Sequence, residues 1–168
     1  VGPGARWKQV AAALEPYGWA LSSGDYGGVG VGGLATAGGI GFLGRKHGLT
    51  IDHLRAVEMV LADGSVVRAS DSQNPDLFWA VRGAGANFGI VTALELDAYA
   101  LSDVVFSVML FDGGDAAALL ERWGEVVERA PRELTSFLYG FSRRGSSPVV
   151  RVVSVYAGDD TDAAVETL

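Results

Sequence analysis

The sequence predicts an α+β chain whose strands pair mainly in antiparallel fashion. Helical and strand patterns follow one another without the strict strand–helix–strand alternation that is typical of a parallel sheet. In addition, the pair Asp63-Gly64 joins two short apolar segments, which favours an antiparallel hairpin. A change of composition just after residue 98 divides the chain into two expected domains, residues 1–98 and residues 99–168.

Two segments of the first domain have sequence patterns that predict secondary structure. Residues 5–14 carry apolar side chains at i, i+3, i+4 and i+7, which predicts an amphipathic helix that ends at Pro16 and Gly18. Residues 54–70 are expected to form the hairpin. A type I′ turn is expected at Asp63-Gly64, since that turn requires two residues with positive φ.

A helix and a strand are expected to close the first domain. Asn74 is a suitable cap, and Pro75 suits the first position of a helix that Gly83 ends. The segment 88–96, with the sequence FGIVTALEL, predicts a buried strand because it is almost entirely apolar.

The second domain is expected to alternate strands with helices. Its apolar periodicities predict a strand at 104–111, a helix at 116–129 capped by Asp115, strands at 134–141 and 149–156, and a helix that begins at Asp162.

Composition excludes several classes of function. The net charge of −7 argues against nucleic acids and anionic membranes as partners. No apolar run is long enough to span a bilayer. The absence of cysteine excludes disulfides and thiolate chemistry, and with only two histidines no metal site is expected. The chain shows no signal segment, so a cytoplasmic location is expected, and its Ala-, Gly-, Val- and Arg-rich composition favours a bacterial origin.

The most distinctive segment is the glycine-dense stretch 24–44, which holds ten glycines. Each glycine costs about 0.5–1 kcal/mol relative to alanine in regular structure. That cost is expected where a ligand must approach the main chain, whose amides can bind phosphate. The segment therefore predicts a backbone-lined site for a large anionic cofactor. The alternative is a tight glycine turn that packs one strand against another.

A Rossmann site is not expected, although Gly39–Gly44 fits the G-x-G-x-x-G pattern. In a Rossmann fold this pattern follows a strand and opens a helix. Here no clear strand precedes the pattern, and no helix is expected over residues 45–48.

A longer stretch, Gly30 to Leu96, resembles flavoproteins of the vanillyl-alcohol oxidase superfamily, in particular the berberine-bridge-enzyme-like and 6-hydroxynicotine-oxidase-like branch. Three blocks carry the resemblance: GVGGLATAGGIGFLGRKHGLTIDHL, VLADGSVV and NPDLFWAVRGAGANFGIVT. The resemblance implies that residues 1–98 are the second subdomain of a PCMH-type FAD-binding domain. Residues 99–168 would then begin an antiparallel-sheet substrate domain.

The same resemblance implies which residues contact FAD. The contacts beside the pyrophosphate and the flavin would be Val31, Gly32, Gly33, Leu34, Gly38, Gly39 and Gly41. Ile90 and Val91 would contact the adenine side through their backbone. Val29 lies near the position that controls access of dioxygen to the flavin, where a valine leaves room for O₂.

The function implied is that of an FAD-dependent oxidoreductase, which passes hydride from a small organic substrate to flavin N5 with O₂ as acceptor. The family's catalytic base would follow Leu168, so no catalytic residue is assigned. The 168-residue chain by itself is expected to bind FAD weakly and to show no turnover. Its expected partner is the remainder of the flavoprotein or a second copy of the chain. Two alternatives stay open: a non-catalytic module that acts in assembly, and an enzyme like UDP-N-acetylenolpyruvylglucosamine reductase.

The sequence departs from the family pattern at the covalent flavin anchors. Tyr26 stands where bicovalent members carry cysteine, so a bond to flavin C6 is not expected. The anchoring histidine of the family would precede Val1. His47 and His53 lie in other motifs, and His53 is expected to be a structural hydrogen-bonding residue.

Six further side chains carry weaker expectations. Trp79 is expected in the core, and Arg82 is expected to tie its helix to the glycine segment or to neutralise a nearby charge. Substrate contacts are conceivable for Tyr139, Arg143, Arg144 and Tyr156.

Overall fold

The computed structural model describes residues 1–101, 103–142, 145–158 and 160–167. The chain forms two compact units, Val1–Ser102 and Asp103–Leu168, each of which is described by itself. Tyr99 and Ala100 belong to the first unit because they form strand β5 (Tyr99–Ala100), which pairs with β1 (Trp19–Ala20). All strand pairs in the described residues are antiparallel, so the α+β class is confirmed.

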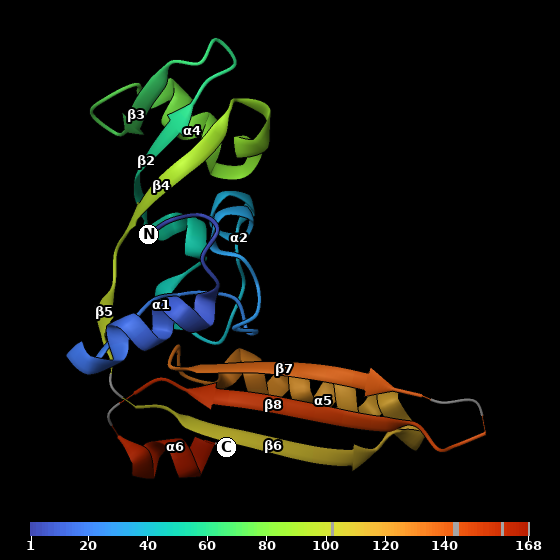
Figure 1. Ribbon diagram of the computed structural model, residues 1–168. Helices are drawn as coiled ribbons and strands as arrows, with labels where there is room; N and C mark the ends of the chain where they lie inside the picture. The colour runs from blue at the N-terminus through green and yellow to red at the C-terminus, as the bar shows by residue number, and fades with distance from the viewer. Residues whose placement is uncertain (102, 143–144, 159, 168) are drawn as a thin grey trace. The chain divides into compact units, whose positions relative to one another are not determined.

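The centre of the first unit is a three-stranded sheet in the order β3-β2-β4 (Figure 1). It comprises β2 (Leu54–Val60), β3 (Val66–Ser70) and β4 (Ile90–Leu96), and α4 (Pro75–Ala84) packs on β3 and on α2 (Val31–Ala37). The core contains the buried side chains of Trp7, Val10, Val31, Ala35, Leu54, Val57, Met59, Ala69, Phe78, Val81 and Leu94.

Short helices complete the first unit. The expected N-terminal helix is α1 (Trp7–Leu14), which is followed by a 3₁₀ turn, η1 (Glu15–Tyr17). Gly18 ends this turn with a φ of 63°, a left-handed conformation that favours glycine. The helix α3 (Gly44–His47) and the 3₁₀ turns η2 (Thr50–His53) and η3 (Gly85–Asn87) lie in the connections.

The sequence reading missed both helices of the glycine region, α2 and α3. α2 forms because Val31 and Ala35, four residues apart, both bury their side chains completely. Its first turn is also held by hydrogen bonds to the segment that precedes α1. The Rossmann arrangement is nonetheless absent from the described residues, because every described strand pair is antiparallel.

The β2–β3 hairpin forms as expected, but its turn is not type I′. Only Gly64 has a positive φ, of 83°, and Asp63 does not. Leu61 N–H donates to Ser65 at 2.9 Å, and Gly64 N–H donates to Leu61 at 3.0 Å. The loop is thus a three-residue turn that closes on a left-handed glycine.

Two further expectations for the first unit were wrong in detail. Asn74 does not cap α4: it adopts a φ of 50°, and its side-chain amide donates to the carbonyl of Arg68 at 2.7 Å. β4 is not a buried strand, since it lies at the edge of the sheet and alternate residues are exposed. Gly83 does end the regular part of α4, with a φ of 118°.

The second unit is a three-stranded sheet in the order β6-β8-β7 with α5 against one face (Figure 1). Asp115, the last residue of the turn η4 (Gly113–Asp115), caps α5 as expected, because its carboxylate accepts from Ala118 N–H at 3.1 Å. The C-terminal helix is capped instead by Asp160, which accepts from Ala163 N–H at 2.9 Å. The elements are β6 (Val105–Asp112), α5 (Ala116–Arg129), β7 (Leu134–Phe141), β8 (Val149–Tyr156) and α6 (Thr161–Thr167).

Over the described ranges, no helix combines the length and the apolar character that crossing a bilayer would require.

Candidate functional site

The start of α2 is held by an antiparallel backbone ladder with residues 3–8. Trp7 N–H donates to Val29 at 3.1 Å, and Val31 N–H donates to Ala5 at 2.9 Å. Gly32 N–H donates to Pro3 at 3.0 Å. The amides of Val31 and Gly32 are therefore already satisfied within the protein and are not free to bind a phosphate.

Gly30 differs from these neighbours because of its register. It lies opposite Arg6 in the ladder, and the hydrogen bonds run on either side of this pair. The N–H and C=O of Gly30 therefore point away from residues 3–8. Gly30 is exposed, and a Cβ added there would meet no atom within 4 Å.

Gly30 was not among the predicted contact residues, but two residues that were, Gly33 and Gly38, also present open backbone. A Cβ at Gly33, in α2, or at Gly38, which caps the end of that helix, would also meet nothing within 4 Å. Nothing inside the described fold requires Gly30 or Gly33 to be glycine. A ligand that lies against the main chain would require it, since a side chain would occupy the ligand's place.

Other glycines of the segment have a structural explanation. A Cβ at Gly41 would lie 1.8 Å from the carbonyl oxygen of Ser23, and one at Gly39 would lie 2.3 Å from Thr50 Oγ1. Gly39 also has a φ of 86°. For these two residues the alternative interpretation, a tight turn packed against protein, is sufficient.

The predicted contacts thus fall into buried and exposed groups. Val31 and Gly41 are buried, whereas Leu34 and Val91 are half-buried. Val29 and Ile90 expose 37% and 72% of their surface. The exposed and half-buried side chains can touch a ligand, whereas Val31 and Gly41 can do so only through their backbone.

The exposed part of this segment fits FAD. Open backbone at Gly30, Gly33 and Gly38 forms a surface that any Cβ would fill, as a bulky planar ligand requires. Val29 and Ile90 add exposed apolar side chains. These five residues are the ones that would hold the cofactor from this chain.

An aromatic cluster missed by sequence reasoning lies next to the glycine segment. Tyr99 O–H shares a hydrogen bond with the imidazole of His53, which is 8% exposed. The ring of His47, at the end of α3, stacks on Tyr99 with centroids 4.0 Å apart. His53 therefore has a structural hydrogen bond, as expected. Tyr99 belongs to a two-residue strand, and no pattern in the sequence announced its role.

The pKa values of His47 and Tyr99, two members of this cluster, are both shifted. Burial is the main cause that lowers the pKa of His47, and the charges of Lys46 and His53 lower it further. Burial, followed by the negative charge of Asp97, raises the pKa of Tyr99. The cluster thus favours neutral His47 and neutral Tyr99.

The remaining candidates lie on α4, on β7 and β8, or outside the described residues. Trp79 is 74% exposed, so its assignment to the core was wrong. Arg82 lies over the ring of Phe78 and 3.9 Å from Asp71, which fits neutralisation of a nearby charge. Tyr156 is buried in a cluster with Leu134 and Ala164.

Of the other three candidates for substrate contact, Arg143 and Arg144 lie outside the described residues. Tyr139 is half-buried in a row of aromatic rings along β7, with centroids 6.3 Å from Phe137 and 6.4 Å from Phe141.

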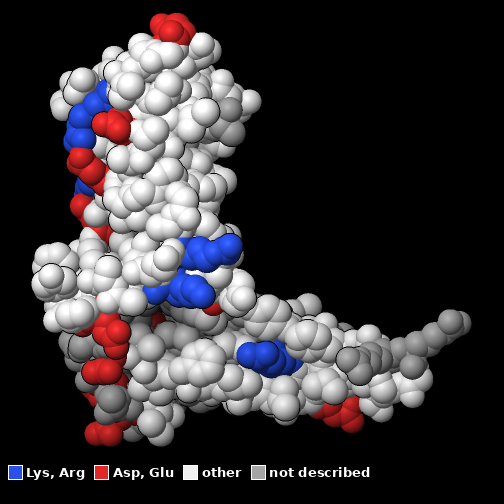
Figure 2. Space-filling model, in the orientation of Figure 1, with Lys and Arg blue, Asp and Glu red and all other residues white. Residues whose placement is uncertain are grey.

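Acidic and basic side chains alternate along one edge of the first unit (Figure 2), and further charged side chains lie at its top and away from that edge. Arg68 makes a bidentate pair with Glu95, and Arg55 Nε donates to Asp97 at 2.6 Å. These hydrogen bonds lower the pKa of both carboxyl groups. The Arg68–Glu95 pair reaches across the central strand β2, from β3 to β4, and both pairs are too exposed to add much stability.

Comparison with known proteins identifies the first part of the chain. Residues 1–70 match the family described as "FAD binding domain". The chain is 42% identical over 130 residues to xylooligosaccharide oxidase from Thermothelomyces thermophilus. This match covers 76% of this chain and 26% of the relative. It is 41% identical over 162 residues to chitooligosaccharide oxidase from Gibberella zeae, covering 94% and 32%.

The fold has similar relatives among solved structures. The crystal structure of 6-hydroxy-D-nicotine oxidase from Arthrobacter nicotinovorans superposes with a TM-score of 0.90 at 30% identity. The match covers 99% of this chain and 37% of that structure. The chain thus spans about a third of the length of the relatives that it matches.

Proposed function

Because the chain belongs to the FAD-linked oxidoreductases of the vanillyl-alcohol oxidase superfamily, we propose that it forms one wall of an FAD site in a larger oxidase. The observation that carries this proposal is the open backbone of Gly30, Gly33 and Gly38 in the region that matches an FAD-binding family. At Gly30 and Gly33 nothing else in the described fold explains the missing side chain, whereas the φ of 141° at Gly38 by itself favours glycine.

When bound, FAD supplies the two-electron chemistry, with flavin N5 accepting hydride from the substrate and O₂ the proposed final acceptor. The residues of this chain bind and position the cofactor. The ladder between residues 3–8 and 29–32 fixes the backbone, so that the N–H of Gly30 points away from residues 3–8, while its C=O lies at the N-terminus of α2. Exposed Val29 and Ile90 provide apolar contact and exclude water from the cofactor.

Val29 supports O₂ as the acceptor. Its side chain is 37% exposed at the edge of the open backbone, beside Gly30. A valine there leaves more room than a larger side chain would, and this is the basis for an oxidase rather than a dehydrogenase. The names of the two fungal relatives also describe oxidases.

Oligosaccharides are the first substrates to test, because the two relatives are named for xylo- and chitooligosaccharides.

Both relatives are fungal, so they give no support to the bacterial origin expected from composition. The cytoplasmic location stays a prediction.

The alternative is a non-catalytic module that acts in assembly, either with the remainder of a flavoprotein or with a second copy. Exposed Ile90, Trp79 and Tyr26 favour it, since large exposed apolar side chains often mark an interface. A module of this kind would have no need for open glycine backbone, and this difference separates the two proposals.

The test uses the longest reading frame that contains this chain. The purified protein is expected to carry flavin absorbance and to form hydrogen peroxide with xylo- or chitooligosaccharides. Gly33→Val is expected to reduce flavin content at least about tenfold, because it places a side chain where the cofactor lies. Gly124→Ala, an equally open site in the second unit, is the matched control. Full flavin content in a folded Gly33→Val protein would contradict the proposed site.

A further inference from the structure

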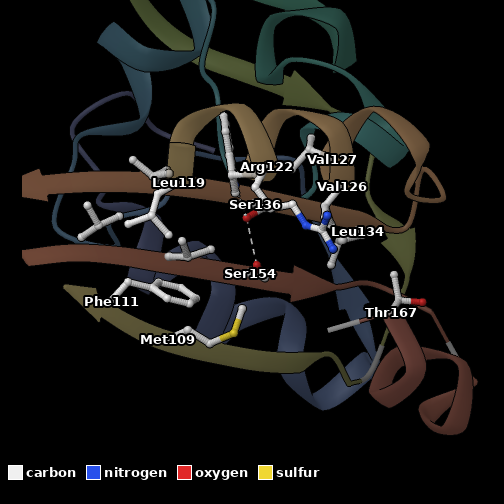
Figure 3. A pocket seen from close by; sticks show the side chains of 14 residues that line it. Met109, Phe111, Leu119, Arg122, Val126, Val127, Leu134, Ser136, Ser154 and Thr167 are labelled. Carbon is white, nitrogen blue, oxygen red and sulfur yellow. Dashed lines mark hydrogen bonds between the residues drawn. The ribbon is translucent and has the colours of Figure 1, made fainter. Parts of the chain in front are cut away.

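The second unit contains a cavity of about 200 Å³ between α5 and the sheet (Figure 3). Its floor is one face of the sheet, because Ser136 on β7, Ser154 on β8 and Ser107 on β6 share a register position. Its roof is α5, whose Leu119, Val126 and Val127 point toward the strands. The remaining floor residues are Met109, Phe111, Leu134, Leu138, Val150 and Val152.

The roof packs loosely. No described residue of α5 is buried, although the helix lies along the sheet, and Leu120 and Val126 expose about half of their surface. An apolar cavity of about 150 Å³ is large enough to bind a benzene-sized molecule. This cavity therefore has room for one aromatic ring with a small substituent.

The hydroxyl groups in the floor leave one donor without an acceptor. Trp123 Nε1 donates to Ser136 Oγ at 2.9 Å, and Ser154 Oγ donates to the same oxygen at 2.9 Å. A serine oxygen has two acceptor positions and one O–H donor. Both acceptor positions of Ser136 are used, and its O–H has no acceptor among the described residues.

The second polar group of the cavity is also a donor. The guanidinium of Arg122 lines the cavity beneath α5 (Figure 3), and it makes no ion pair with a carboxylate in the described ranges. A guanidinium has only donors and always carries a positive charge. Ser136 thus has an O–H free to donate, and the exposed guanidinium of Arg122 at the edge of the cavity favours an acceptor with negative charge.

We propose that this cavity binds a compact monocarboxylate whose apolar body is about the size of a benzene ring. The ring would occupy the apolar volume between Leu119 and Met109. The carboxylate oxygens would accept hydrogen bonds from Ser136 Oγ and from the guanidinium of Arg122. All the residues involved belong to the second unit, so the inference does not depend on the proposed FAD site.

The probe is benzoate, titrated into the 168-residue chain while the indole N–H resonance of Trp123 is followed by NMR. Trp123→Phe identifies that resonance among the four tryptophans. Benzoate is expected to shift it in a saturable way. Benzamide, the neutral analogue, is expected to bind at least about tenfold more weakly, because a charge-assisted hydrogen bond is lost.

Variants locate the site. Arg122→Gln is expected to weaken benzoate binding at least about tenfold, and Arg129→Gln, on the same helix but outside the cavity, is expected to leave it unchanged. Leu119→Trp fills the cavity and should abolish binding in a chain that still folds. The proposal is overturned if benzoate fails to shift the Trp123 resonance, if benzamide binds as tightly, or if folded Leu119→Trp still binds.

Discussion

Single glycines of the segment 24–44 perform different tasks, and two alanine substitutions separate them. Gly41→Ala is expected to destabilise the first unit by roughly 2 kcal/mol or more, because its Cβ would lie 1.8 Å from the carbonyl of Ser23 and overpack a buried position. Gly33→Ala is expected to stabilise it by up to about 1 kcal/mol, since alanine is the better helix former and its Cβ meets nothing within 4 Å. Urea unfolding followed by tryptophan fluorescence measures both. Equal effects of the two variants would contradict the division into packed and open glycines.

His47 gives the first unit a pH dependence that can be assigned. Its folded-state pKa is lowered, mainly by burial, so the unfolded chain binds more protons near this value. The stability contributed by neutral His47 is therefore present above the unfolded value of about 6.5 and is lost as the pH falls toward the folded value. We expect the free energy of unfolding to decrease between pH 7 and pH 5.

His47→Gln should flatten that decrease, as measured by urea unfolding at both values of pH. The paired carboxyls of Glu95 and Asp97, whose pKa values are also lowered, lose their contribution at a lower pH, near and below about 4. A pH dependence from 7 to 5 that is unchanged in His47→Gln would show that another group is responsible.

At the scale of elements, α4 shows that a helical pattern does not reveal which face is covered. Phe78 is fully buried, whereas its neighbour Trp79 is 74% exposed. Phe78→Ala is expected to cost about 3–5 kcal/mol of stability, and Trp79→Ala to change it by no more than about 0.5 kcal/mol. Urea unfolding compares these variants, and a large loss from Trp79→Ala would contradict the exposed position.

The elements that could be predicted from sequence are those stabilised by local signals. α5, β7 and β8 occupy the expected residues because each has a clear apolar period, and the carboxylate of Asp115 marks the start of α5. α2 could not be predicted, since it depends on hydrogen bonds to residues 3–8 and on the burial of Val31 and Ala35 in the core. The same holds for the candidate site. Gly30 faces outward because of its pairing with Arg6, and Gly41 is buried because it packs against Ser23. Both partners are distant from these glycines in sequence.

For the whole molecule, the resemblance implies that FAD lies between two subdomains, and the chain supplies residues of one of them. The exposed residues Val29, Gly30, Gly33 and Ile90 and the half-buried Gly38 all belong to the unit Val1–Ser102. A single wall buries only part of a cofactor, and most of the affinity of a pocket comes from nearly complete burial. The purified 168-residue chain is therefore expected to show no stoichiometric absorbance in the flavin bands.

Titration of this chain with FAD, followed by flavin fluorescence, should give binding at least about a hundredfold weaker than in the longest protein that contains it, which corresponds to about 2.7 kcal/mol. If Gly33→Val abolishes this weak binding and Gly124→Ala leaves it unchanged, the residual affinity for FAD lies on the open backbone of α2. Stoichiometric flavin in the isolated chain would mean that one wall is enough, and the division of the cofactor between two subdomains would then be wrong for this protein.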